Sequence, residues 1–190
     1  FHHLQTLETY ILQLGQPAAL AQPLGEMKKV FAELDGLPTE QRQRYPELVQ
    51  QLLTRQRQLQ QAAASAYTGE RQSLAADSPA LLIGELSRSL AGFLLDYQLR
   101  HYPLPEQERF ILSPPALQAL DQAIEGRFAD LQSRQTGHAA ELGKIRSSYQ
   151  FVRGQIQQGG KRGHGGAEFY LSRAVTDLDE LAQAVAQGSR

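Results

Sequence analysis

The chain has 190 residues, of which 41% are hydrophobic and 21% are charged, and these proportions are typical of a folded globular protein. Its 19 basic and 20 acidic side chains nearly cancel, which removes the cationic field of a general nucleic-acid binder, so we expect no nucleic-acid partner. Cysteine is absent, which excludes disulfides, thiolate metal sites and cysteine nucleophiles.

The first apolar stripe predicts a helix with an interruption. Between residues 4 and 14, leucine and isoleucine recur at alternating steps of three and four, which places them on one helix face. The pattern lapses around Gly15, Pro17 and Pro23, and resumes with residues from Leu20 to Leu34. We therefore expect one long helix that is interrupted or kinked between the two prolines and ends at Asp35-Gly36.

Prolines mark where the next two helices begin and end. Pro46 suits the first turn of a second helix, which we expect to end near Gly69. The sequence Asp77-Ser78-Pro79 combines a capping side chain with a proline and opens a third helix, which Pro103 closes. Because the helix formers Leu, Ala, Gln, Glu and Arg dominate the chain, we predict an all-α protein.

The longest apolar seam begins after Ser113-Pro114-Pro115. Its residues follow an almost continuous heptad from Leu117 to Ile156, and the spacing survives two glycines. A turn at Thr136-Gly137 that makes two antiparallel helices is the alternative, but a hairpin provides no reason for the phase to continue. We therefore expect one long helix, with His138 on its seam as a polar layer that sets the register or as part of a small wet cavity.

A glycine-rich segment separates this seam from the last helix. Residues Gly159 to Gly166 should form a loop, because so many glycines disfavour a helix. A phosphate-binding loop is not expected there, since Arg162 stands where that motif needs Ser or Thr. An apolar stripe from Phe169 to Val185 predicts a last helix. The whole is predicted to be an elongated antiparallel helical bundle of four to six helices, in a single domain over residues 1–190.

We find no recognisable catalytic or metal-binding motif in the sequence. His138 and Glu141 form one reversed pair, whereas a di-iron bundle needs Glu-x-x-His on two helices. Asp177, Asp179 and Glu180 lie away from the apolar stripe of the last helix, so a solvated face explains them. We therefore expect no enzymatic activity, no metal and no cofactor.

Arg146, Tyr149 and Arg153 are the candidate ligand-binding residues. Their spacing of three and four puts them on one stripe of a helix. Two guanidiniums beside an aromatic ring suit a carboxylate, so we expect a small anionic ligand. The alternative is that both arginines extend to solvent or to acidic neighbours. Arg100-His101-Tyr102 form a second candidate, for which compensation of the helix C-terminal charge is the alternative.

The ends of the chain bear on its context. The longest unbroken apolar run, Ala80 to Ile83, is far shorter than a membrane-spanning helix needs. The chain opens with Phe1 and its only methionine is Met27, so we expect it to be part of a longer protein that carries any membrane anchor.

Two late segments carry a resemblance to a known class of protein. Lys144 to Val152, followed by a loop and Phe169 to Arg173, is similar to the late helix pair of extracytoplasmic all-helical sensor domains. The absence of cysteine and the amphipathic helices at both ends fit the same class. The chain therefore resembles the periplasmic sensor domain of bacterial membrane-bound signal-transduction proteins, namely sensor histidine kinases, diguanylate cyclases and chemoreceptors.

This resemblance implies a location and a function. It implies a domain on the periplasmic face of the bacterial inner membrane, flanked by membrane helices, that forms a parallel homodimer. A small anionic ligand or a periplasmic partner protein would shift one helix against another. Nitrate-type sensors of this class have an arginine-rich signature near the first helix, whereas no arginine precedes Arg42 here. Nitrate is therefore a poor guess for the ligand. The alternatives are a helical scaffold that binds partner proteins, which predicts a large exposed apolar patch, and a secreted helical protein.

Overall fold

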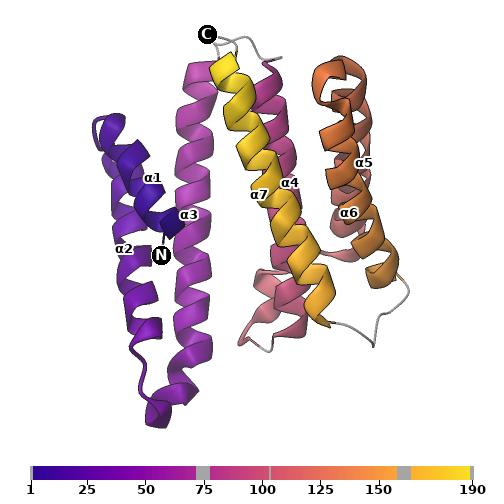
Figure 1. The fold of residues 1–190 in the computed structure, drawn as a ribbon. Coiled ribbons are helices and arrows are strands. Elements are labelled where there is room, and N and C mark those ends of the chain that lie inside the picture. The colour runs from indigo at the N-terminus through magenta and orange to yellow at the C-terminus, as the bar shows by residue number, and fades with distance from the viewer. Residues whose placement is uncertain (1, 72–77, 103, 158–163, 189–190) are drawn as a thin grey trace. The chain divides into compact units, whose positions relative to one another are not determined.

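The computed structural model describes residues 2–71, 78–102, 104–157 and 164–188 (Figure 1). Within these ranges there are seven α-helices, three short 3-10 helices and no strand, which confirms the all-α prediction. Seven exceeds the four to six helices expected, because two of the long helices predicted from the sequence are each divided in two.

The chain divides into two compact units. Unit 1 comprises residues 1–74 and 103–110, and unit 2 comprises residues 75–102 and 111–190. We predicted a single bundle domain over residues 1–190. Because two compact units can belong to one domain, the single domain stays a prediction.

Unit 1 is built around the helix pair α2 and α3, with α1 packed on α2. Ile11, Leu20 and Leu24 form its small buried cluster, against which Leu59 packs. In chain order, its elements are α1 (His2–Gln13), α2 (Ala18–Asp35), η1 (Thr39–Arg44), α3 (Tyr45–Arg71) and η2 (Gln107–Arg109).

The kink expected between two prolines is a full break between α1 and α2. Gly15 has a φ of 81° and Gln16 a φ of 53°, both in the left-handed region. The Gln16 N–H donates to the Ile11 carbonyl oxygen at 2.9 Å, which closes the end of α1. Pro23 lies inside α2 instead of interrupting it. An interruption was expected, but its placement between the prolines was wrong, because the left-handed turn at Gly15 ends α1 before Pro17.

Unit 2 contains four helices arranged as an antiparallel bundle. α4 packs against α5 and α7, and α6 packs against the same two helices. Ser87 of α4 donates to Asp179 of α7, whereas Tyr97, later in α4, lies near Glu168, earlier in α7, so these helices run in opposite directions. In chain order, the elements are α4 (Pro79–His101), α5 (Pro114–Arg134), η3 (Thr136–His138), α6 (Ala139–Gln157) and α7 (His164–Gly188).

The core of unit 2 takes one apolar stripe from each of its four helices. Spacing by three and four residues keeps each stripe on the inner face. Each fully buried leucine, isoleucine or phenylalanine contributes about 1.5–3 kcal/mol relative to an exposed one. The core residues are Ile83, Leu86, Leu90, Phe93, Ile124, Phe128, Leu131, Leu142, Ile145, Tyr149, Val152, Ala167, Leu171, Ala174, Leu178 and Leu181.

Both helix starts predicted from serine followed by proline are confirmed. α4 begins at Pro79 and α5 at Pro114. Ser113 also caps α5, because its hydroxyl oxygen accepts the Ala116 N–H at 3.4 Å. Ser78 precedes α4 without such a bond.

The long helix expected from Leu117 to Ile156 is two helices. The chain turns through η3, and α5 and α6 pack against each other in opposite directions. The apolar spacing continues across the turn because both helices face one core. His138 is therefore not on a seam, since its side chain is 41% exposed and its Nδ1 lies 3.6 Å from Glu141 Oε2. The predictions of one helix and of a register-setting histidine were wrong.

The last helix differs from its prediction at its start. α7 begins at His164, so the end of the predicted loop Gly159–Gly166 is helical, while residues 159–163 lie outside the described residues. Phe169, expected on the apolar stripe, is 64% exposed. In the part of the chain that the structure describes, no helix is both long and apolar enough to cross a membrane.

Candidate functional site

The three predicted ligand-binding residues lie together on the side of α6 that faces α5. Tyr149 is fully buried, and Arg146 and Arg153 are half-buried on either side of it along the helix. The structure gives each arginine an acidic partner on α5, namely Glu125 for Arg146 and Asp121 for Arg153. The arginines therefore join two helices.

Asp121, Tyr149 and the half-buried Arg153 form a hydrogen-bonded polar group that we call the Asp121 cluster. Asp121 is 8% exposed. The Tyr149 hydroxyl donates to Asp121 Oδ1, while Arg153 Nε and Nη2 lie 2.9 Å and 2.7 Å from Asp121 Oδ2. The Tyr149 ring also packs edge-on against Phe93 of α4, with centroids 5.6 Å apart. The cluster thus sits where α4, α5 and α6 meet.

The protonation states of the cluster follow from its surroundings. Burial raises the pKa of Tyr149 well above its ordinary value, and the hydrogen bond to Asp121 raises it further. The hydrogen bond to Asp121 likewise raises the pKa of Arg153. Tyr149 is therefore a neutral donor and Arg153 a permanent cation, so neither serves as a general base near neutral pH.

A second ion pair lies beside the cluster on the same two helices. Arg146 Nε and Nη2 donate to Glu125 Oε2 at 3.2 Å and 2.8 Å, and Arg146 Nη1 donates to Gln132 Oε1 at 3.0 Å. Gln150 Nε2 donates to the same glutamate oxygen at 3.3 Å. The two arginines and two carboxylates therefore cancel in formal charge.

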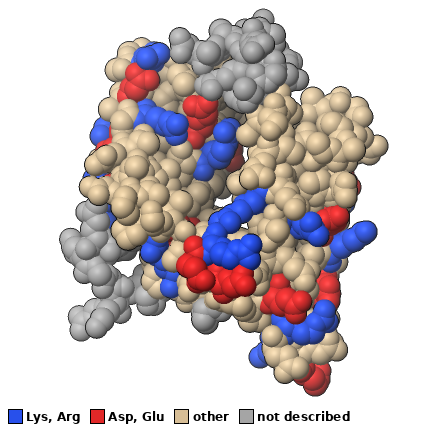
Figure 2. All heavy atoms as spheres, turned by 180° about the vertical axis from the view of Figure 1, so that it is seen from behind, with Lys and Arg blue, Asp and Glu red and all other residues tan. Residues whose placement is uncertain are grey.

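This pairing is the alternative that the sequence left open, in which the arginines contact acidic neighbours. The face drawn in Figure 2 likewise shows acidic side chains beside basic ones. A role of Arg146, Tyr149 and Arg153 in binding a ligand stays a prediction, and any such ligand meets arginines that already have partners.

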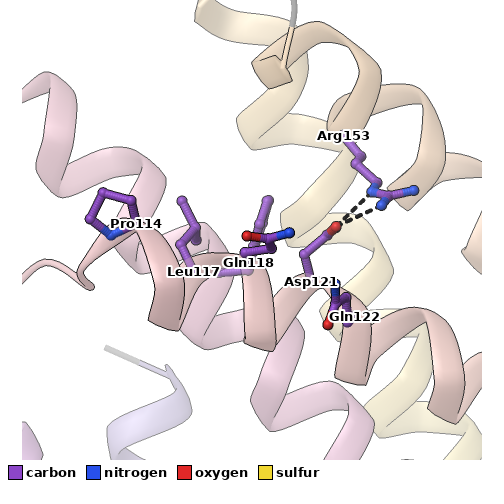
Figure 3. Close-up of a pocket in the computed structure, with 7 residues that line it drawn as sticks. Pro114, Leu117, Gln118, Asp121, Gln122 and Arg153 are labelled. Carbon is purple, nitrogen blue, oxygen red and sulfur yellow. Dashed lines mark hydrogen bonds and ion pairs between the residues drawn. The ribbon is translucent and has the colours of Figure 1, made fainter.

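A pocket of about 340 Å³ opens beside the Asp121 cluster. Its volume lies within the range usual for small-molecule sites. In Figure 3, the side chains that line the pocket from α5 lie one after another along that helix, and Arg153 extends from α6 to Asp121. The lining residues are Phe93, Pro114, Leu117, Gln118, Asp121, Gln122 and Arg153.

Of the second candidate from the sequence, Arg100-His101-Tyr102, Arg100 contacts Asp96, and His101 Nδ1 lies 2.7 Å from the Tyr97 carbonyl oxygen. Asp96 is 3% exposed, and its Oδ2 accepts from Arg100 Nε at 2.6 Å. Its Oδ1 accepts the Leu112 N–H at 2.6 Å, and Arg100 Nη2 donates to the Leu112 carbonyl oxygen at 2.6 Å. Arg100 and Asp96 thus tie the end of α4 to the segment that leads into α5.

Metal binding has no geometric support in the described residues. Across residues 2–71, 78–102, 104–157 and 164–188, no three histidine, cysteine, aspartate or glutamate side chains lie close enough to hold an ion.

Asp179, expected on a solvated face, accepts a hydrogen bond from the Ser87 hydroxyl at 2.6 Å. Its carboxylate therefore links α7 to α4.

Sequence reasoning missed Asp121 and Glu125. Both lie on the face of α5 that carries Ile124 and Phe128, which was a usable signal, because acidic residues beside a buried stripe need partners. Asp121 and Arg153 are also equally distant in sequence from Gly137, so a hairpin folded there pairs them. The assumption of one continuous helix concealed this pairing.

Comparison with known proteins leaves the family open. No protein family matches the chain, and neither a curated protein nor a solved structure is significantly similar to it. A function must therefore be argued from the residues and geometry described above.

Proposed function

We propose that this chain is the signal-sensing domain of a bacterial membrane-bound receptor and lies on the extracytoplasmic side of the inner membrane. In this proposal, a small molecule or a periplasmic partner protein binds the helices of unit 2, and a displacement of one helix against another carries the signal to the membrane. The proposal includes the parallel homodimer that the resemblance implies.

The observation that carries the proposal is the pocket next to the Asp121 cluster. The pocket is bounded by α4, α5 and α6, and the Asp121 cluster holds α5 and α6 together. A molecule in the pocket therefore touches the same side chains that set the α5–α6 contact. A ligand that contacts both helices shifts their arrangement if it binds one arrangement more tightly than another, and the spin-label experiment below tests for this shift.

The location is tested by fusing alkaline phosphatase to the natural protein after this chain. The enzyme is active only outside the cytoplasm, so activity in whole cells supports the proposal. A parallel fusion to green fluorescent protein, which is fluorescent when it stays in the cytoplasm, is the control. Fluorescence without phosphatase activity contradicts an extracytoplasmic sensor.

The helix displacement is tested with spin labels. Since the chain has no cysteine, cysteines introduced at the exposed positions Ala129 of α5 and Ser147 of α6 are labelled specifically. A panel of amino acids, carboxylates and amines is first screened for compounds that raise the melting temperature. A stabilising compound should change the distance between these labels but not between labels at Ala116 and Ala129, both on α5. Stabilisation with both distances unchanged contradicts a relay through these helices.

A scaffold that binds partner proteins is the second candidate, and one observation favours it. Phe151, Phe169 and Tyr170 of α6 and α7 are all exposed and form an aromatic group, with Tyr170 5.2 Å from Phe151 and 5.6 Å from Phe169 between ring centroids. Exposed apolar groups of this kind are common at protein interfaces. The double substitution Phe151→Ser and Phe169→Ser should abolish partner capture by a scaffold and leave a ligand-dependent label shift intact.

A further inference from the structure

The end of the pocket presents two opposite charges side by side. Among the described residues, Arg153 contacts Asp121 through Nε and Nη2. Because a guanidinium has five N–H groups, further donors remain for a ligand. Asp121 Oδ2 faces Arg153, and Oδ1 accepts from Tyr149. Because the charges of Asp121 and Arg153 cancel, this end of the pocket has a dipole and no net positive charge.

A dipolar site selects a different ligand from a cationic one. An anion attracted by Arg153 is repelled by Asp121 at nearly the same distance, so its net gain is small. A molecule that carries both charges can place its carboxylate against Arg153 and its ammonium group against Asp121. Both interactions are charge-assisted hydrogen bonds, which are about twice as strong as neutral ones.

The rest of the wall defines the body of the ligand. Phe93, Pro114 and Leu117 give an apolar surface, while Gln118 and Gln122 supply amide groups that can either donate or accept. A ligand pocket with a mainly apolar wall and a few polar groups fixes orientation through those groups. The body that fits is aliphatic or aromatic.

From these features we infer that the pocket binds a small zwitterion with an apolar body, the chemistry of a free α-amino acid with an aliphatic or aromatic side chain. The inference rests on the proposed function, since it names the ligand class of the same pocket. Bound in this way, the ligand contacts Asp121 of α5 and Arg153 of α6 at once, which links occupancy to the packing of α5 against α6.

The test is isothermal titration calorimetry on the whole chain with three matched probes. L-leucine carries both charges, 4-methylpentanoate lacks the ammonium group, and 3-methylbutylamine lacks the carboxylate. L-leucine should bind, and each analogue should bind at least about tenfold more weakly, because it loses a hydrogen bond to a charged group. L-phenylalanine extends the test to an aromatic body.

Two tryptophan variants locate the binding. Gln122→Trp fills the pocket from an exposed position of α5 and should abolish binding of L-leucine. Ala123→Trp, the next residue, is also exposed but does not line the pocket, so binding should be unchanged. These variants leave the ion pair intact, whereas Arg153→Gln, which should also weaken binding, disturbs the packing of α6. Circular dichroism checks that each variant is folded.

Three results overturn the inference. One is binding of 4-methylpentanoate or 3-methylbutylamine as tight as that of L-leucine. Another is the absence of binding by both amino acids at concentrations up to about 10 mM, where even a Kd weaker than about 1 mM is measurable. The third is binding that survives Gln122→Trp. The reporter fusions and spin labels test the proposed function without these probes, so its failure is distinguishable from failure of the ligand class.

Discussion

Asp121 is a carboxylate within the apolar interior of unit 2, and its charge is acceptable there because of its partners. A buried charge without partners costs several kcal/mol, whereas one that is paired and hydrogen-bonded is tolerated. Tyr149 and Arg153 supply donors to both oxygens. In the pair Arg173 and Asp177, by contrast, the arginine side chain is 68% exposed, so solvent screens the attraction. We therefore expect the contacts of the buried Asp121 to contribute more to the free energy of unfolding than those of the more exposed pair.

Replacement of Tyr149 by Phe tests the hydrogen bond from the phenolic hydroxyl to Asp121. The variant keeps the ring contacts with Phe93 and Phe128 but leaves Asp121 Oδ1 without its donor. Because the acceptor is charged and buried, we expect a loss of about 1.5–3 kcal/mol in the free energy of unfolding, measured by urea denaturation. Tyr170→Phe, at an exposed tyrosine, is the control and should change stability by less than about 0.5 kcal/mol. Equal stabilities for the two variants contradict this account.

The raised pKa of Tyr149 predicts a loss of stability in alkaline solution. The unfolded chain releases the phenolic proton near the ordinary pKa of 10.0, while the folded chain retains it, so the folded state binds more protons above that pH. The stabilisation is therefore complete below about pH 10 and falls as the pH rises further, by about 1.4 kcal/mol per unit for one proton. Tyr149→Phe should show a smaller decrease between pH 9 and 11. Identical pH profiles for this variant and the natural protein disprove the assignment.

At the scale of elements, Asp96 organises the connection between α4 and α5. Its carboxylate accepts from Arg100 on its own helix and from the Leu112 backbone, and Arg100 also donates to the Leu112 carbonyl. The contact therefore holds the last turn of α4 against the chain that enters α5. Since the intervening segment 103–110 belongs to unit 1, this contact fixes the point where the chain returns to unit 2.

Two matched aspartates separate the effect of burial from that of pairing. Asp96 with Arg100 and Asp130 with Arg134 are both pairs of aspartate and arginine four residues apart, but Asp96 is buried and Asp130 is half in solvent. Asp96→Ala should lower the free energy of unfolding by about 3 kcal/mol, at the low end for a broken buried pair because Arg100 still reaches water. Asp130→Ala should lower it by about 0.5 kcal/mol or less. Chemical denaturation of both variants measures the contrast, and similar losses refute it.

At the scale of the whole molecule, each unit has an apolar core of its own. Ile11, Leu20 and Leu24 belong to the cluster of unit 1, and none of them belongs to the core of unit 2. Because apolar burial is local to each core, a cavity in one unit should weaken that unit first.

Hydrogen exchange measured by mass spectrometry tests whether the units open separately. Leu24→Ala empties a buried position in unit 1 and should cost about 2–5 kcal/mol. We expect faster exchange in α1 to α3 and unchanged exchange in α4 to α7. Leu178→Ala, in the core of unit 2, is the matched variant and should give the opposite map. A uniform increase in both units with either variant favours the single cooperative domain predicted from the sequence.

The local features of the fold were predictable from the sequence because they depend on neighbours along the chain. Helix formation follows from composition and from apolar spacing by three and four, and the starts at Pro79 and Pro114 follow from the conformational restriction of proline. The grouping of Arg146, Tyr149 and Arg153 was likewise visible, since residues three and four apart share a helix face.

The partners of these residues depended on the tertiary structure. An apolar stripe looks the same on one long helix and on two helices that face a common core, so the spacing alone could not reveal the turn at η3. That turn decides which residues face Arg153, and with them the charge and shape of the pocket. Short-range periodicity was enough to predict that the chain is helical. The pairing of Asp121 with Arg153 came from the fold, because charges far apart in sequence interact only once the fold brings them together.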